Sequence, residues 1–193
     1  RLGLAVDPDV PLIDMVTRLV SHKGLDLVKG GVDNIMTYSN AQFVVLGSGD
    51  WEYEQFFKEM QAKYPGRFVL CQALCRSCAQ DLRRLRYFPD AEQERAVRSF
   101  TDGGAALGSI PVVRETGGLK DSITDSGDGK GNGFTFQTYD TQDMLNSVHR
   151  AIYAYNESKD GWKVLVERAM ACDNSWGRSA NDYIRLYKQL INS

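Results

Sequence analysis

The stretch Phe43-Val44-Val45-Leu46-Gly47-Ser48-Gly49-Asp50 decides the fold. It begins with four apolar residues, a short run that is typical of a buried strand. The glycines and the aspartate then end the strand, and from Trp51 to Lys63 apolar residues recur at helical spacing. A strand, a tight turn and a helix in this order form the unit from which parallel sheets are built.

The same unit recurs along the rest of the chain. Further strands are predicted at Pro11–Val16, Arg67–Leu70 and Ile110–Val113, and further helices at Leu25–Met36, Thr141–Asn156, Gly161–Ala171 and Arg178–Leu190. Strands that alternate with helices at this rhythm predict an α/β fold with a Rossmann-like, doubly wound parallel sheet. No repeat or linker divides the chain, so we predict one domain over residues 1–193.

Length and composition are those of an ordinary globular domain. The 193 residues are enough for one well-buried core. A formal net charge of −2 gives no reason to expect nucleic acid or an anionic membrane as a partner, and no apolar run approaches the roughly 20 residues that span a bilayer. Four cysteines do not make a disulfide scaffold, and Cys71, Cys75 and Cys78 lack a fourth zinc ligand. Because the first residue is Arg1, we expect an internal fragment of a longer protein.

Two cations flank the turn between the first predicted strand and its helix. In open α/β sheets, ligands bind outside the carboxyl ends of the strands, where free N–H groups favour an anion. Arg18 could there offer a planar fork to phosphate oxygens, and Lys23 a compact charge on a flexible stem. From spacing alone, however, two solvated cations are the ordinary interpretation.

Two glycine loops follow predicted strands in equivalent places. Gly47 and Gly49 could let the backbone approach a nucleotide, and the N–H groups of Thr116-Gly117-Gly118 could form an anion nest. The alternative is a plain turn in each case, with Asp50 as the helix cap of the first. The aromatic residues of the helix that follows are expected to pack in the core rather than to stack on a base: Trp51, Tyr53, Phe56 and Phe57.

Five segments together resemble one family. Segment 15–27 (MVTRLVSHKGLDL) is similar to the (S/G)RLxxQKGxD segment of bacterial glycogen synthases and plant starch synthases, with His22 in place of the usual Gln. Segments 44–50 (VVLGSGD), 110–119 (IPVVRETGGL), 131–134 (GNGF) and 175–183 (SWGRSANDY) follow in the family's order and spacing. Outside a central gap, the resemblance covers most of residues 3–190.

The resemblance implies the C-terminal donor-binding domain of a GT-B enzyme, a retaining glucosyltransferase built from two Rossmann-like domains. Such an enzyme transfers glucose from ADP-glucose to the 4-hydroxyl at the non-reducing end of an α-1,4-glucan, without a metal or another cofactor. Arg18 and Lys23 match the pair that grips the diphosphate and acts in catalysis, and Gly47, Gly49 and Thr116–Gly118 match donor-binding positions. The N-terminal acceptor domain would be missing, so the isolated chain is expected to be inactive. Its expected location is the cytoplasm in a bacterium or the plastid in a plant.

The central stretch departs from the family. Between Leu70 and Gly108 the motif YAGxDxFLMPSxxEPCGLxQxxAxxYG is missing. Codons compatible with Phe88–Phe100, read one base later, encode Phe-Leu-Met-Pro-Ser-Lys-Ser-Glu-Pro-Cys-Gly-Leu-Ser, and the loss of one base after Leu107 would restore the frame. We therefore hypothesise two compensating frame errors, natural or from sequencing, that bracket residues 71–107. The source DNA tests this hypothesis directly.

The frame hypothesis has chemical consequences. The family glutamate that contacts the donor glucose has no counterpart, since Arg95 overlaps its codon, and the family cysteine falls at Val97. Pro89 would remove a ladder donor from a buried strand. We therefore expect residues 71–107 to be disordered or rearranged, with a helix over Asp90–Phe100, and glucose transfer to be impaired.

Two alternatives remain open at this point. One is a non-catalytic relic that binds a nucleotide or a glucan. The other is a different two-domain glycosyltransferase, such as a relative of sucrose synthase; a phosphorylase would need a lysine-bound pyridoxal phosphate, for which the sequence makes no case. The preference for ADP-glucose or UDP-glucose is also left open.

Overall fold

The computed structural model describes residues 3–5, 7, 9–72, 87–90, 109–172 and 176–191. Its strands are β1 (Leu12–Val16), β2 (Gln42–Leu46), β3 (Phe68–Cys71), β4 (Tyr87–Asp90), β5 (Ile110–Arg114) and β6 (Phe134–Phe136). Its helices are η1 (Ser21–Lys23), α1 (Leu25–Tyr38), α2 (Trp51–Lys63), α5 (Gly117–Ser122), η2 (Ser126–Asp128), α6 (Thr141–Glu157), α7 (Lys159–Ala171) and α8 (Trp176–Ile191).

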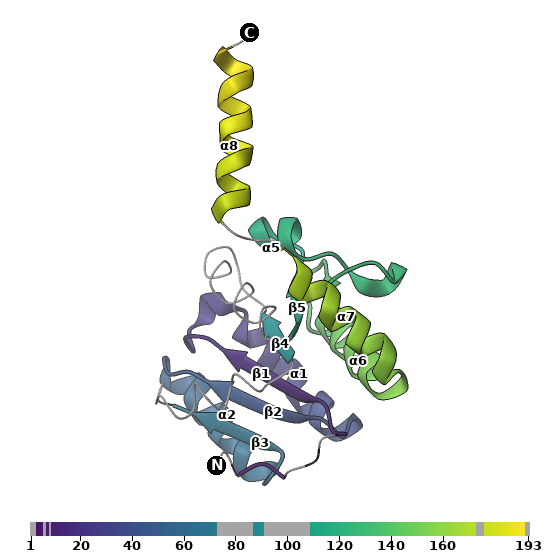
Figure 1. Cartoon of the computed structure of the whole chain (residues 1–193). Coiled ribbons are helices and arrows are strands. Elements are labelled where there is room, and N and C mark those ends of the chain that lie inside the picture. The colour runs from purple at the N-terminus through teal and green to yellow at the C-terminus, as the bar shows by residue number, and fades with distance from the viewer. Residues whose placement is uncertain are drawn as a thin grey trace.

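The strands pair into two parallel ladders, β1-β2-β3 and β4-β5-β6. In the first ladder Ile13 lies opposite Phe43, and in the second Val112 lies opposite Phe134. Strand β4 lies beside β1, so the ladders together have the order 3-2-1-4-5-6 of a doubly wound fold (Figure 1). The predicted fold class is therefore confirmed.

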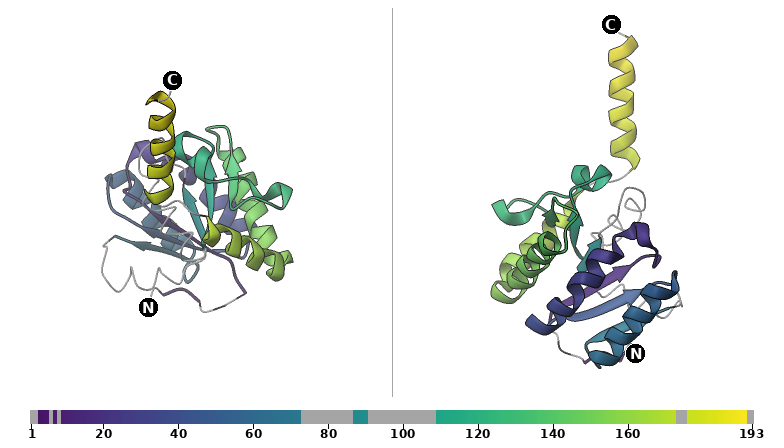
Figure 2. Two further views of the ribbon diagram at one scale, coloured as in Figure 1. Left: turned by 45° about the horizontal axis from the view of Figure 1, so that its top comes forward. Right: turned by 180° about the vertical axis from the view of Figure 1, so that it is seen from behind.

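Helices α1 and α2 cover one face of the first ladder, and α6 and α7 lie beside the second (Figure 2). Phe68 of β3 stacks on Phe43 of β2, with ring centres 5.4 Å apart, and on Phe57 of α2, at 6.1 Å. Helices α1 and α6 approach closely because Gly31 has no side chain: a β-carbon there would lie 2.8 Å from Cε of Met144. This contact joins the two halves of the core.

One strand forms where the sequence argued against it. Tyr87–Asp90, which contains Pro89, pairs in parallel with β5 over its whole length. Among the described strands, β4 is hydrogen-bonded to β5 alone, although β1 lies beside it. Proline is tolerated in a strand where its missing N–H need not enter a ladder. The expected disruption is therefore wrong for residues 87–90. Most of the segment 71–107, including the predicted helix beyond Asp90, Arg95 and Val97, lies outside the described residues.

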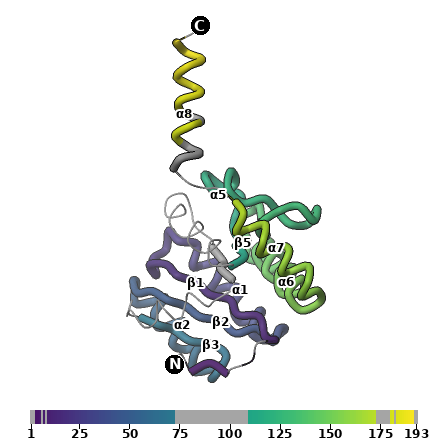
Figure 3. The backbone as a smooth tube through the Cα atoms, viewed as in Figure 1, coloured from purple at the N-terminus to yellow at the C-terminus, as the bar shows by residue number. Residues whose placement is uncertain are grey.

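Helix α8 projects away from the rest of the molecule (Figures 1 and 3). It carries exposed apolar side chains along its last turns: Tyr183, Ile184, Leu186, Tyr187, Leu190 and Ile191. Tyr183 and Tyr187 stack on each other, with ring centres 6.4 Å apart. Among the described helices, none is both long and apolar enough to cross a membrane.

Candidate functional site

The loop after β1 places Arg18 in solvent on a fixed backbone. Leu19, the next residue, is fully buried, and its N–H donates to the carbonyl of Ser48 at 3.0 Å. In return, the N–H of Asp50 donates to the carbonyl of Leu19 at 2.6 Å. The loops after β1 and β2 are thus joined by main-chain bonds, while the Arg18 side chain stays exposed. Such an arrangement gives the guanidinium freedom to meet a ligand from a rigid base.

Lys23 stands in a different environment. It ends the short helix η1, and Gly24, with φ of +69°, turns the chain into α1. Only 6% of Lys23 is exposed, and lysine is almost never buried as a plain solvated charge. The interpretation of two solvated cations therefore fits Arg18 but not Lys23.

Gly47 and Gly49 allow the β1 and β2 loops to touch. A β-carbon on Gly47 would overlap the carbonyl oxygen of Thr17, and one on Gly49 would overlap that of Leu19. Their observed role is close approach between two backbones, and this same approach holds the Arg18 loop in place. A direct contact of these glycines with a nucleotide stays a prediction.

At the start of α2 the expected cap by Asp50 does not form, and the expected packing of its aromatic residues in the core holds only in part. The Asp50 side chain makes no capping bond, and the Glu54 carboxylate instead accepts from the N–H of Gly49 at 3.0 Å. Tyr53 and Phe57 are buried, as predicted, but Trp51 is 74% exposed and does not pack in the core. The prediction was wrong for Trp51, which lies on the solvent-exposed side of the first turn of α2, next to the exposed Glu52.

The loop after β5 leads into α5 through Thr116, whose side chain makes no capping bond. Gly117 has a φ of +48°, a left-handed conformation that favours glycine, and a β-carbon on Gly117 or Gly118 would meet nothing within 4 Å. Both glycines are exposed. The backbone of Gly117 and Gly118 is therefore open to a ligand, which is what the predicted anion nest requires.

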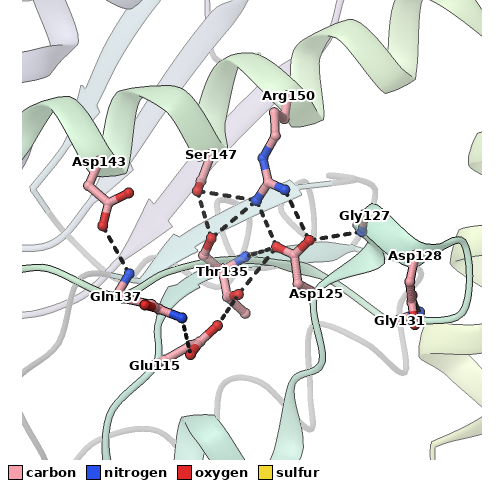
Figure 4. A network of polar contacts seen from close by, with 10 residues as sticks. All are labelled: Glu115, Asp125, Gly127, Asp128, Gly131, Thr135, Gln137, Asp143, Ser147 and Arg150. Atoms are coloured by element: carbon pink, nitrogen blue, oxygen red, sulfur yellow. Dashed lines mark hydrogen bonds and ion pairs between the residues drawn. The ribbon is translucent and has the colours of Figure 1, made fainter.

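A network of hydrogen bonds connects the start of this loop to β6 and α6 (Figure 4). Glu115 accepts a hydrogen bond from the hydroxyl of Thr135 at 2.6 Å, and Asp125 accepts one from the N–H of Thr135 at 2.8 Å. Arg150 of α6 donates to both carboxylate oxygens of Asp125, at 3.0 and 2.7 Å. The network ties the β5 loop to β6 and α6, and so gives the Thr116–Gly118 loop a rigid base.

Asp125 is the most strongly perturbed carboxylate of this network. Burial by itself would raise the pKa of Asp125, but the hydrogen bonds from Arg150, Thr135 and Gly127 outweigh it and lower the pKa from 3.8 to about 2. Sequence reasoning missed this pair, because residues 25 positions apart carry no local pattern that joins them.

The glycine-rich segment between α5 and β6 is also held in place. Asn132, only 9% exposed, accepts from the N–H of Thr124 at 2.7 Å and donates to the carbonyl of Ser122 at 3.0 Å. Arg168 of α7 donates to the carbonyl of Gly131 at 3.1 Å. Within the described ranges, no group of three or more His, Cys, Asp or Glu side chains is placed to hold a metal ion.

The two candidate loops lie at the same edge of the sheet, the one formed by the carboxyl ends of its strands. Asp26, three residues after Lys23, accepts a hydrogen bond from Tyr139 in the loop after β6, and Tyr139 in turn lies under Arg114 at the end of β5. The start of α1 is therefore adjacent to the carboxyl ends of β5 and β6. The Arg18–Lys23 loop follows the carboxyl end of β1, and the Thr116–Gly118 loop follows the carboxyl end of β5.

Known proteins resemble the chain in sequence and in fold. No family model matches the chain. It is 41% identical over 202 residues to a glycogen synthase of Pseudothermotoga lettingae, a match that covers 99% of the chain and 40% of that protein. A glycogen synthase of Geobacillus stearothermophilus is 40% identical over 199 residues, with the same two shares.

Solved structures give the same result. The catalytic domain of starch synthase IV from Arabidopsis thaliana, bound to ADP and acarbose, matches with a TM-score of 0.82 and 30% identity, over 100% of this chain and 41% of that one. A sucrose-phosphate synthase from Thermosynechococcus elongatus shares only the fold, with a TM-score of 0.65 and 18% identity over 97% of this chain and 47% of that one. The chain thus spans about two fifths of the length of the glycogen synthases it matches. Along nearly all of its length the chain is homologous to glycogen synthases, and it shares the fold of a starch synthase catalytic domain.

Proposed function

We propose that the chain is the donor-binding part of an ADP-glucose-dependent glucan synthase. The whole enzyme would transfer glucose, with retention of configuration, from ADP-glucose to the 4-hydroxyl of an α-1,4-glucan. The observation that carries this proposal is the relationship to glycogen synthases over 99% of the chain, which includes both candidate loops. The starch synthase of similar structure was bound to ADP and acarbose, a nucleoside diphosphate and a saccharide.

In this proposal Arg18 and Lys23 hold the diphosphate. Arg18 is exposed and can form paired hydrogen bonds with phosphate oxygens. Lys23, only 6% exposed, lies in a less polar environment, where a charge is less screened. As the bond to glucose breaks, negative charge grows on the departing diphosphate, and the two cations bound to it stabilise that charge. The open N–H groups of Gly117 and Gly118 would bind further oxygens of the donor.

Calorimetric titration of the 193-residue chain with ADP tests the proposal. The unaltered chain should bind ADP, and Arg18→Ala should weaken binding at least about tenfold, because a charge-assisted pair of hydrogen bonds is lost. Lys58→Ala, which removes an exposed charge from α2, is the matched control and should bind as the unaltered chain does. A parallel titration with UDP measures the preference between the two nucleotides.

The second candidate is a relic that binds a nucleotide or glucan without catalysis. It is favoured by the sequence of residues 88–100, which lacks the family glutamate. Failure to bind ADP at millimolar concentration would contradict the donor-site proposal. Binding that Arg18→Ala leaves unchanged would place the nucleotide elsewhere on the molecule.

A further inference from the structure

Tyr139 connects the two sides of the candidate site. It lies in the loop between β6 and α6, and its hydroxyl donates to Oδ1 of Asp26 at 2.5 Å. The guanidinium of Arg114 lies over its ring, 5.1 Å from the ring centre. One aromatic side chain therefore contacts two segments that are 88 residues apart in sequence (114 − 26).

Each of these contacts leads directly to a candidate loop. Asp26 lies in the first turn of α1, three residues after Lys23. Arg114 is the last residue of β5, two residues before Thr116. Apart from Tyr139, the two loops are connected through the sheet, where β4 lies between β1 and β5 (Figure 1). Tyr139 provides a second connection, which does not run through the sheet.

The connection is rigid at its base. Asp143 accepts hydrogen bonds from the N–H groups of Gln137 and Thr138, at 3.0 and 2.8 Å, and Asp140 caps α6 by accepting from the N–H groups of Gln142 and Asp143. The backbone on both sides of Tyr139 is thus fixed to the start of α6. A phenol has only two side-chain torsions, so a fixed backbone also defines where its hydroxyl lies.

The contacts of Tyr139 with Asp26 and Arg114 are of stabilising kinds. A phenol that donates to a carboxylate makes a short, charge-assisted hydrogen bond, and an arginine over the ring adds a cation–π attraction. Burial, followed by the bond to Asp26, raises the pKa of Tyr139 to about 12. The hydroxyl therefore stays protonated, and able to donate, throughout the neutral range.

We propose that Tyr139 is a positioning residue that sets the spacing between the Arg18–Lys23 loop and the Thr116–Gly118 loop. The inference rests on the proposed function, since it requires both loops to bind one nucleoside diphosphate. A ligand that spans the loops needs the correct spacing, whereas a ligand that needs only one of them does not. Loss of the hydrogen bond between Tyr139 and Asp26 should thus weaken the binding of ADP more than that of AMP, which carries one phosphate fewer.

Calorimetric titration of Tyr139→Phe with both nucleotides tests this inference. The substitution removes only the hydroxyl and keeps the ring under Arg114. We expect the affinity for ADP to fall roughly fivefold, the lower end of typical coupling between sites, with little change for AMP. Asp26→Ala should reproduce this loss, and the double variant should lose no more than either single one. Asp26→Asn, which keeps an oxygen acceptor, should restore most of the binding.

Thermal unfolding of the same variants separates positioning from stability. Tyr153→Phe, at an exposed tyrosine of α6, is the matched control and should change neither affinity. If Tyr139→Phe lowers only the melting temperature, or lowers the affinities for ADP and AMP equally, the inference is overturned while the proposed function stands. If the unaltered chain does not bind ADP, both are overturned.

Discussion

Arg150 of α6 holds both carboxylate oxygens of Asp125, with Nη1 3.0 Å from Oδ1 and Nη2 2.7 Å from Oδ2. The same Asp125 receives the N–H groups of Gly127 and Thr135, so one carboxylate joins a glycine-rich loop, a strand and a helix. A bidentate pair with a partly buried carboxylate is among the stronger ionic contacts in proteins. Its removal should therefore have a measurable and pH-dependent effect.

Asp125→Asn should lower the free energy of unfolding by about 1–2 kcal/mol at pH 7. The folded pKa of Asp125, about 2, lies below the ordinary 3.8, so the carboxylate stabilises the fold above pH 4 and loses that effect as the pH falls towards 2. Urea unfolding at pH 7 and pH 2.5 measures the difference between variant and unaltered chain. That difference should shrink at pH 2.5, and a constant difference would contradict the assignment. Asp121→Asn, at an exposed aspartate of α5, is the control.

Gly47→Ala and Gly49→Ala should each destabilise the fold by about 1–3 kcal/mol or more, because the new methyl group would overlap a backbone carbonyl that cannot move aside freely. Gly118→Ala is the matched control: its β-carbon meets nothing within 4 Å, and its free energy of unfolding should change little. Guanidinium unfolding of the three variants compares them. Equal stabilities for Gly47→Ala and Gly118→Ala would show that the two loops do not touch as described.

Asn132→Asp should cost about 1–3 kcal/mol, although the two side chains have nearly the same shape. The amide nitrogen of Asn132 donates to the carbonyl of Ser122 at 3.0 Å and to Sγ of Cys172 at 3.1 Å. A carboxylate would turn these attractions into repulsion at a buried position. Thermal unfolding at pH 7 checks the loss, with the exposed Asn40→Asp as control. A melting temperature equal to that of the control would contradict the buried amide.

Phe57→Ala should lower the free energy of unfolding by about 3–5 kcal/mol, since the ring is fully buried and stacks on Phe68. Tyr38→Ala, which removes an exposed ring from the end of α1, should cost well under 1 kcal/mol. Urea unfolding with tryptophan fluorescence measures both variants. A small loss at Phe57 would mean that α2 does not pack on the sheet in solution.

The order of strands and helices followed from local patterns. Helix α2 has the bounds that the apolar spacing predicted, and the ends of α1, α6 and α7 differ from the predicted ends by one or two residues. The short helix α5 and strand β6 were not predicted, because elements of three to six residues contain too few turns or alternations to show a period. Pro89 misled the prediction for β4, since sequence does not show that β4 is hydrogen-bonded to β5 but not to β1, which lies beside it.

For the candidate site, the sequence predicted which loops form it, and the structure showed which contacts hold those loops in place. The positions after strands and a family resemblance predicted the candidate residues Arg18, Lys23, Gly47, Gly49 and Thr116–Gly118. Only the structure shows that Lys23 is buried, that Gly47 lies against Thr17, and that the open Gly117 stands on a loop braced by Glu115. None of these contacts follows a helical or strand period, so no local pattern could reveal them.

The sequence by itself determined the parallel α/β class and the family resemblance, because hydrophobic period and motif order are properties of the chain read in one dimension. It also predicted the loops that would meet a nucleotide. Tertiary structure decided which distant residues meet. The pairs Asp125–Arg150 and Asp26–Tyr139 are 25 and 113 positions apart, and each depends on how α1 and α6 pack on the sheet. Side-chain packing and burial act in three dimensions, so contacts of this kind become visible only when the chain is folded.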